Sequence, residues 1–368
     1  MRKLAVGVAI GLALSACGGS SASQTHGSPS PSKAKQGSPG ATPRSTPTSS
    51  PAVLPGSFGV LSTFRGNSAT YTVSTIATDG KVTASSTAVS GPPQVTCGDT
   101  AAAILPQPVS TSNTRVYYMD AQGVVRFLTP GGDSGRATTV PTGASTRSMF
   151  TVSPDDTRIV VVVAQFKTGG ASTRMYIEDL NGGGNHIELF TESGSFGLWP
   201  TGWHGSMLVV AKVPTCTQGG GPGCCGPLEF HVVDPSTAVR SATVGNATNC
   251  PVVGPAMPAG AACATPAQIN VLDWAGATLK SYSISGYPAA YLSPNGQAVA
   301  EVVNADTLIL GPNKTLPNVQ ACGWIDDTHV FTDGDIQRQA RVADVTSGTV
   351  TPTPAQGVCA GRIPGGLG

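Results

Sequence analysis

The chain has 368 residues, of which 11% are charged, and its formal net charge is +1. Such a small net charge leaves no basic field for binding nucleic acid. A chain of this length can form one large β domain or two ordinary domains. Its 47 glycines and 30 prolines disfavour long helices and favour short strands joined by turns. The composition therefore predicts an all-β protein.

The first sixteen residues have the organisation of an export signal. Arg2 and Lys3 supply positive charge, and residues 4–14 form an apolar run that is too short to span a bilayer as a helix. The run ends in Leu14-Ser15-Ala16-Cys17, which resembles the lipobox of bacterial lipoprotein signals. The resemblance implies cleavage before Cys17, attachment of diacylglycerol to its thiol, and a protein anchored to the membrane outside the cytoplasm. The alternative is an ordinary secretory signal with a chance cysteine.

The segment that follows Cys17 has the composition of a tether. Residues 18–55 are almost all Gly, Ser, Pro, Thr, Ala and Gln, and they lack hydrophobic periodicity. Such a segment cannot offset the entropy of ordering, so we expect it to be disordered. A flexible chain of this length reaches about 35 Å. The expected organisation is a signal peptide over 1–16, a lipidated cysteine and tether over 17–55, and a folded domain over 56–368.

A hairpin pattern recurs seven times in the folded domain. In each copy an alternating apolar run leads to a turn and then to a second run. The turns lie at Asp79, Asp120, Asp179, Asp234, Asp273, Gly311 and Asp344. The six intervals from Asp79 to Asp344 cover 265 positions, a mean of about 44, which matches the repeat of a four-stranded propeller blade. We therefore expect a β-propeller with seven blades, with six as the second choice; a β-sandwich gives no reason for one mean period.

A second turn precedes several of these hairpins and carries a family resemblance. Ser153-Pro154-Asp155-Asp156 and Ser293-Pro294-Asn295-Gly296 resemble the Ser-Pro-Asp-Gly turn of the WD40-like repeats in TolB-type β-propellers. In that family the turn joins the first and second strands of a blade. The turns at Trp203 and Trp324 resemble it in part. The resemblance implies a scaffold, lid or sensor domain, but a fold says little about function by itself.

Eight cysteines remain after Cys17: Cys97, Cys216, Cys224, Cys225, Cys250, Cys263, Cys322 and Cys359. An even number outside the cytoplasm favours disulfides, although eight cysteines allow 105 pairings. We favour Cys250 with Cys263, and Cys322 with Cys359, which would tie together the first and last parts of the final blade. Cys216 would bond Cys224 or Cys225 and leave the other for Cys97. The spacings are not those of a zinc site, so no metal or cofactor is expected.

The sequence shows no nucleophile beside a base and no pair of facing acids. The candidate residues for contact with a ligand or partner are Trp203, His204, Trp324 and Asp326, since they share the turns that follow first strands. We expect a non-catalytic binding or scaffold module that presents this face to an envelope protein or a cell-wall polymer. The alternative is a propeller hydrolase or lyase acting on wall glycan, with Asp326, Asp327 or His204 at the mouth of the channel.

Overall fold

The computed structural model describes residues 57–64, 68–91, 94–97, 101–167, 170–194, 196–214, 227–284, 286 and 289–360. All of them belong to one compact unit, Val53–Gly368. The predicted signal peptide, Cys17 and the tether lie outside the described residues. Cys216, Cys224 and Cys225 also lie outside them, so the disulfides predicted for these three cysteines stay predictions.

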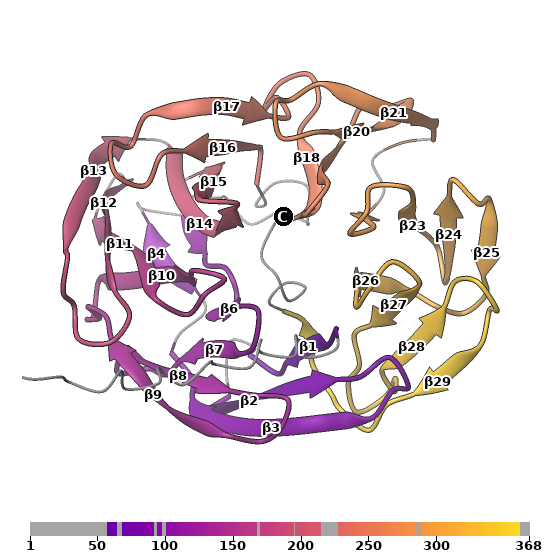
Figure 1. Cartoon of the computed structure of the whole chain (residues 1–368), viewed down its shortest axis with the longest axis horizontal. Coiled ribbons are helices and arrows are strands. Elements are labelled where there is room, and N and C mark those ends of the chain that lie inside the picture. Colours follow the sequence, from indigo (N-terminus) through magenta and orange to yellow (C-terminus); the bar gives the residue numbers. More distant parts are fainter. Residues whose placement is uncertain are drawn as a thin grey trace, which may run out of the picture. The chain divides into compact units, whose positions relative to one another are not determined.

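The described residues form strands and no helices, and they therefore contain no helix that could cross a membrane. Seven four-stranded antiparallel sheets stand in a ring (Figure 1). The chain is thus an all-β, seven-bladed β-propeller, as the hairpin period predicts.

The blades are numbered in chain order, and the strands of each blade are given from the inside of the ring outward. Blade 1 consists of β30 (Val358–Cys359), β1 (Gly59–Ser62), β2 (Thr70–Ile76) and β3 (Val82–Val89). Blade 2 consists of β6 (Val109–Thr111), β7 (Val116–Met119), β8 (Val124–Leu128) and β9 (Ser134–Thr139). Blade 3 consists of β10 (Thr146–Val152), β11 (Arg158–Lys167), β12 (Gly170–Asp179) and β13 (Ile187–Gly194). Blade 4 consists of β14 (Phe196–His204), β15 (Met207–Pro214), β16 (Glu229–Val233) and β17 (Arg240–Val244).

Blade 5 consists of β18 (Val252–Met257), β19 (Gly260–Ala264), β20 (Gln268–Leu272) and β21 (Thr278–Ser283). Blade 6 consists of β22 (Ala290–Leu292), β23 (Val299–Val303), β24 (Asp306–Leu310) and β25 (Lys314–Leu316). Blade 7 consists of β26 (Ala321–Trp324), β27 (His329–Thr332), β28 (Arg341–Asp344) and β29 (Val350–Pro352). A separate hairpin, β4 (Gln94–Cys97) with β5 (Ala101–Ile104), lies in the chain between blades 1 and 2.

The core of the propeller lies between neighbouring blades, because each sheet buries both of its faces against the next. The second strand of blade 3, β11, reads Arg-Ile-Val-Val-Val-Val-Ala-Gln-Phe-Lys and is buried over most of its length. Its residues alternate between two clusters: Val161 packs with Tyr117 of blade 2, and Val160 packs with Leu208 of blade 4. Outer strands such as β21 are half exposed and correspondingly polar.

The two ends of the propeller meet in blade 1, which is completed by the C-terminal strand β30. Leu61 and Ser62 of β1 pair with Cys359 and Val358 of β30. Figure 1 shows the first blade, in indigo, beside the last blade, in yellow. The predicted disulfide between Cys322 and Cys359 is confirmed, with one correction. It joins β26 of blade 7 to β30 of blade 1, so it crosses the seam between two blades rather than tying parts of one blade.

The sequence pattern predicted seven recurring hairpins. In six of the seven blades the predicted hairpin joins the third and fourth strands. The copy at Asp120 is the exception, because it joins the second and third strands, β7 and β8, of blade 2. The corresponding hairpin of that blade turns at 129–133, which has Asp133 as its only acid. This mistaken turn is one reason for the uneven spacing of the predicted repeats.

Candidate functional site

The two tryptophans that we expected on a binding face are packed between blades. Trp203 is the last residue but one of β14 and is 6% exposed, in a cluster with Leu208 and Val160. Trp324 ends β26 and is 2% exposed, and its Nε1 donates a hydrogen bond of 2.9 Å to the carbonyl oxygen of Tyr291 in blade 6. Partner contact at this end of the ring stays a prediction, and the buried indoles would contribute little surface to it.

His204 is half-buried at the end of β14 and stacks on Trp274, which lies in the turn after β20. The ring centroids are 4.6 Å apart and the planes are tilted by 18°. The indole Nε1 of Trp274 donates to the carbonyl oxygen of Pro258 at 2.8 Å. This contact holds the turns of blades 4 and 5 together, so His204 has a packing role at this end of the propeller.

Asp326 and Asp327 act as acceptors within and between turns. Asp326 Oδ1 accepts hydrogen bonds of 2.8 Å from the backbone N–H groups of Thr328 and His329, and its carboxylate also contacts His329 Nδ1 at 2.9 Å. Asp327 Oδ1 accepts a bond of 2.8 Å from the backbone N–H of Asn295, in the corresponding turn of blade 6. Both acids are therefore occupied by turn geometry, and they do not face each other across a cleft as a general acid and base would.

The turn at Asp326 predicts a pH dependence of stability. Burial acts to raise the pKa of Asp326, but the hydrogen bonds from Thr328 and His329 outweigh it and hold the pKa below its usual 3.8. A lowered folded-state pKa means that the carboxylate stabilises the fold above about pH 4 and that this contribution is lost as the pH falls through the folded value. We expect Asp326→Asn to lower the Tm by about 2–3 °C at pH 7 and by less at pH 3. Thermal melts of both proteins at pH 7, 5 and 3 measure this, and a constant gap would contradict it.

A cavity lies toward the starts of the innermost strands, away from the turns that follow these strands. Its volume is about 1130 Å³. Blades 1 to 6 all line it with residues of their first strands, among them Arg147, Trp199, Val252, Tyr291 and Cys359. The turns that carry Trp203 and Trp324 lie beyond the other ends of these strands. The central cavity, as we name this space, therefore opens away from these turns, although the indole of Trp324 reaches Tyr291, one of its lining residues.

The wall of the central cavity is mostly apolar. Six prolines, Trp199, Phe64, Met149 and several small aliphatic residues contribute to it: the prolines are Pro106, Pro108, Pro200, Pro227, Pro251 and Pro255. Proline cannot donate a backbone hydrogen bond and keeps its ring fixed, so such a wall is both apolar and rigid. This composition is that of a small-molecule pocket, in which a few polar groups orient an apolar ligand.

Two charged residues, Asp120 and Arg147, are among the residues that line the central cavity. Asp120 Oδ1 accepts hydrogen bonds from the backbone N–H groups of Gln122 and Val124 at 3.0 and 2.9 Å. Its other oxygen lies 3.6 Å from Nε of Arg126. The carboxylate is thus committed to its own hairpin and to a neighbouring cation.

Arg147 is held by the loop before β10. Its Nη1 donates to the carbonyl oxygens of Thr146, at 2.9 Å, and of Ala144, at 3.5 Å, and also contacts that of Gly143. Its Nε is buried and has no acceptor among the described residues, and burial lowers the pKa of the guanidinium. A second buried atom without a described partner, Oε1 of Gln107, also belongs to a lining residue. Both atoms are covered by protein, so they do not by themselves mark a place where a ligand in the cavity would bind.

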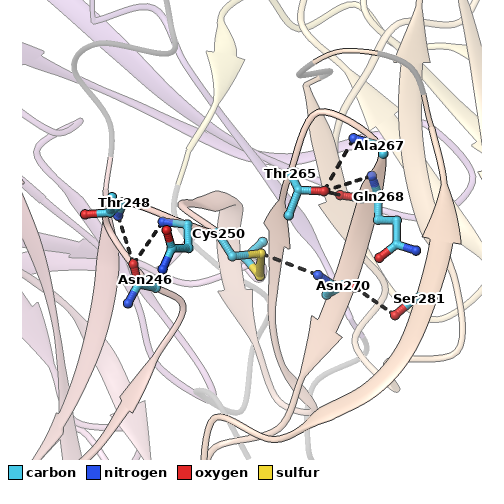
Figure 2. The surroundings of a disulfide bond; sticks show 10 residues. Asn246, Thr248, Cys250, Thr265, Ala267, Gln268, Asn270 and Ser281 are labelled. Atoms are coloured by element: carbon cyan, nitrogen blue, oxygen red, sulfur yellow. Dashed lines mark hydrogen bonds between the residues drawn. A yellow bond between two sulfur atoms is a disulfide. The ribbon is translucent and has the colours of Figure 1, made fainter.

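A disulfide braces the wall of the central cavity at blade 5. Cys250 and Cys263 are bonded at 2.05 Å, as predicted. Figure 2 shows Asn270 donating from Nδ2 to Cys250 Sγ at 3.5 Å and accepting from Ser281 Oγ at 2.7 Å. Pro251 and Val252, which follow Cys250 directly, line the cavity. Cys97 is also disulfide-bonded, and its buried side chain packs in the cluster between blades 3 and 4.

Within the described ranges, no group of three or more His, Cys, Asp or Glu residues is arranged to hold a metal ion. The residues that sequence reasoning missed are those of the central cavity, above all Arg147 and Tyr291. Each lies a few residues before a Ser-Pro turn, Arg147 in β10 and Tyr291 in β22. That spacing marks the first strand of a blade, which lines the channel in any propeller, and it was a usable signal for these two positions.

No protein-family model matches the chain, and no curated protein matches it. Among solved structures, the chain is similar to a protein in the crystal structure of the mitotic checkpoint complex, with 14% identity and a TM-score of 0.43, over 69% of this chain and 78% of that one. It is similar to a prolyl endopeptidase with 12% identity and a TM-score of 0.36, over 81% of this chain and 43% of that one. It is also similar to prolyl oligopeptidase B from Galerina marginata, with 8% identity and a TM-score of 0.34, over 80% of this chain and 41% of that one. Likenesses this low carry no functional argument, so the fold rests on the strand pairing of this chain.

Proposed function

We propose that this protein is an exported lipoprotein, anchored through Cys17, whose propeller binds a molecule of the cell envelope at the end where the central cavity lies. The observation that carries the proposal is the cavity itself: a mostly apolar, proline-rich wall to which six blades contribute. A closed ring braced by disulfides is a stable frame for such a site, since its loops can vary without loss of the fold.

Two further features support the cellular location and the family. Disulfides persist in oxidising compartments outside the cytoplasm, and both disulfides that we favoured are present. The Ser153 and Ser293 turns join the first and second strands of blades 3 and 6, which is the place of the similar turn in TolB-type, WD40-like propellers. These positions support a TolB-type relationship, and with it a role as an envelope scaffold or binding module.

The anchoring is tested on the protein from native membranes. We expect mass spectrometry to find an N-terminal peptide that begins at a diacylated Cys17, because the lipobox directs cleavage before it. Cys17→Ala should move the protein out of the membrane fraction, since an unacylated chain loses its two lipid tails. The predicted export signal, residues 1–16, is unchanged in this variant, so a loss from the membrane fraction would reflect the missing lipid. An unmodified Cys17 within an uncleaved wild-type chain would contradict the proposal.

The location of the binding site is tested with a photo-crosslinking amino acid. Ala144 lines the central cavity and is exposed, whereas Ser347 is exposed in the turn between β28 and β29, at the other end of the ring. We expect irradiation of intact cells to attach an envelope molecule to the Ala144 variant and not to the Ser347 variant. Adducts from Ser347 alone would place the site at the predicted tryptophan-bearing end instead.

A further inference from the structure

The charged side chains in the wall of the central cavity are engaged by the protein itself. Arg147 and Asp120 are the two charged residues that line the cavity. The guanidinium of Arg147 is held by three carbonyl oxygens of the loop 143–146. The carboxylate of Asp120 accepts two backbone N–H groups of its own turn and lies 3.6 Å from Nε of Arg126. These two residues are opposite in sign, so the described wall carries no net charge that would favour an ionic ligand.

The buried hydroxyl groups of the wall also have partners within the protein. Ser148 Oγ and Thr201 Oγ1 donate hydrogen bonds to backbone carbonyl oxygens at 2.6 and 2.9 Å. The hydroxyls of Ser110 and Thr151 lie 3.3 Å apart and form a hydrogen bond with each other. All four residues are buried and line the cavity. Because these hydroxyls already have hydrogen-bond partners, they add little affinity for a polar ligand.

The remainder of the wall is complementary to an apolar body. Met149 and Val252 line it and are buried, Trp199 is half-buried, and the six prolines have no backbone N–H to donate. A volume of about 1130 Å³ is ample for a drug-sized molecule, which pockets of about 300–1000 Å³ commonly hold. An ion that entered this space would lose water without gaining a free counter-charge, whereas an apolar molecule would remove both its own surface and the wall from water.

We propose that the central cavity binds an uncharged, predominantly apolar small molecule, whose body lies against Trp199 and the proline-rich wall. This proposal rests on the proposed function, because it names the ligand class of the same cavity. The charged side chains and buried hydroxyls of the wall are occupied by the protein, so the cavity selects its ligand by excluding charge rather than by a polar anchor. A neutral molecule and an ion built on the same apolar body should therefore differ in affinity.

The test uses the mature chain, residues 17–368 with Cys17→Ser, so that no attached acyl group competes. The reporter is N-phenyl-1-naphthylamine, an uncharged dye that fluoresces in apolar surroundings. Three competitors share one naphthyl body and differ in charge: 1-naphthalenemethanol is neutral, 1-naphthoate is an anion, and 1-naphthylmethylammonium is a cation. We expect the dye to bind and the alcohol to displace it. Each ion should need a concentration at least about 10-fold higher, because it leaves water without finding a free counter-charge.

The place of binding is tested at Trp199, the one tryptophan among the described residues that line the cavity. We expect Trp199→Ala to weaken the binding of dye and alcohol about 10-fold, since it removes a large apolar contact. Trp199→Phe keeps an aromatic ring and should fall between this variant and the wild type. The control is Leu279→Ala, which truncates a 56% exposed side chain on the outer strand β21 and should leave both affinities within about twofold. Circular dichroism and thermal melts confirm that each variant is folded.

Three results would overturn the proposal. The first is displacement of the dye by either ion at the same concentration as the alcohol or a lower one. The second is equal binding of dye and alcohol by the wild type and by the folded Trp199 variants, because the probes would then bind elsewhere. The third is no binding of the dye or the alcohol at all. If the Ala144 crosslink still captures an envelope molecule in any of these cases, the proposed function stands and only the ligand class is wrong.

Discussion

Replacing Cys322 and Cys359 together by serine is expected to lower the free energy of unfolding by about 4 kcal/mol, the loop-entropy value for a closure of this length. The two residues are 37 positions apart in the chain, and their disulfide crosses the seam between blades 7 and 1. That seam depends on β30, which pairs with β1 through only two residues, Val358 and Cys359. We therefore expect the variant to open there first.

Urea denaturation measures the loss, and hydrogen exchange locates it. The matched control is the double serine variant of Cys250 and Cys263, which are 13 positions apart within blade 5 and should cost about 3 kcal/mol. Amides of β1 should exchange faster in the Cys322/Cys359 variant and at the wild-type rate in the control. Equal protection of β1 in all three proteins would show that the seam is held without the disulfide.

Gly260→Ala is expected to lower the free energy of unfolding by about 3–5 kcal/mol, the range of severe packing mutations. Gly260 begins β19 with φ +136°, and a Cβ built there would lie 1.9 Å from the carbonyl oxygen of Leu272. That oxygen belongs to the backbone of the neighbouring strand β20, so it can retreat only if the sheet moves. The variant should fold poorly or melt at a much lower temperature.

The control for this substitution is Gly205→Ala, in the corresponding turn of blade 4. Gly205 also has a positive φ, +54°, but a Cβ there meets no atom within 4 Å. Its expected cost is about 1 kcal/mol, from the left-handed backbone alone. The difference between the two variants in thermal and urea melts measures the steric clash together with the greater backbone cost of φ +136°. Similar small losses for both would mean that blade 5 can widen to admit the methyl group.

The propeller could be predicted from the sequence because most of its paired strands are neighbours in the chain. Within a blade each strand pairs with the next one in the chain, so the alternating runs and the turns at Asp179, Asp234 and Asp273 report the architecture directly. The error at Asp120 has a local cause as well. Its Asx-type turn between β7 and β8 has the same chemistry as a third-to-fourth-strand turn, and a pattern cannot distinguish the two hairpins of one blade.

Neither the closure of the ring nor the central cavity could be predicted in this way. β30 joins β1 across almost the whole domain, through two residue pairs, and no local pattern marks so short a strand. Trp203 and Trp324 have the sequence environment of exposed turn residues, yet the neighbouring blades cover them. The central cavity is assembled from the first strands of six blades, so the side chains of Arg147 and Trp199 meet one wall only once the ring is closed.

The amino-acid sequence by itself determined the all-β class, the repeat of about 44 residues and the Cys250–Cys263 disulfide within blade 5, because these depend on residue periodicity, turn chemistry and close cysteine spacing. The tertiary structure alone decided which strand completes blade 1, which two blades the Cys322–Cys359 disulfide joins, which aromatic side chains are buried, and which residues line the central cavity. The physical reason is the same in each case: these features arise from contacts between blades, which residues distant in the chain form together.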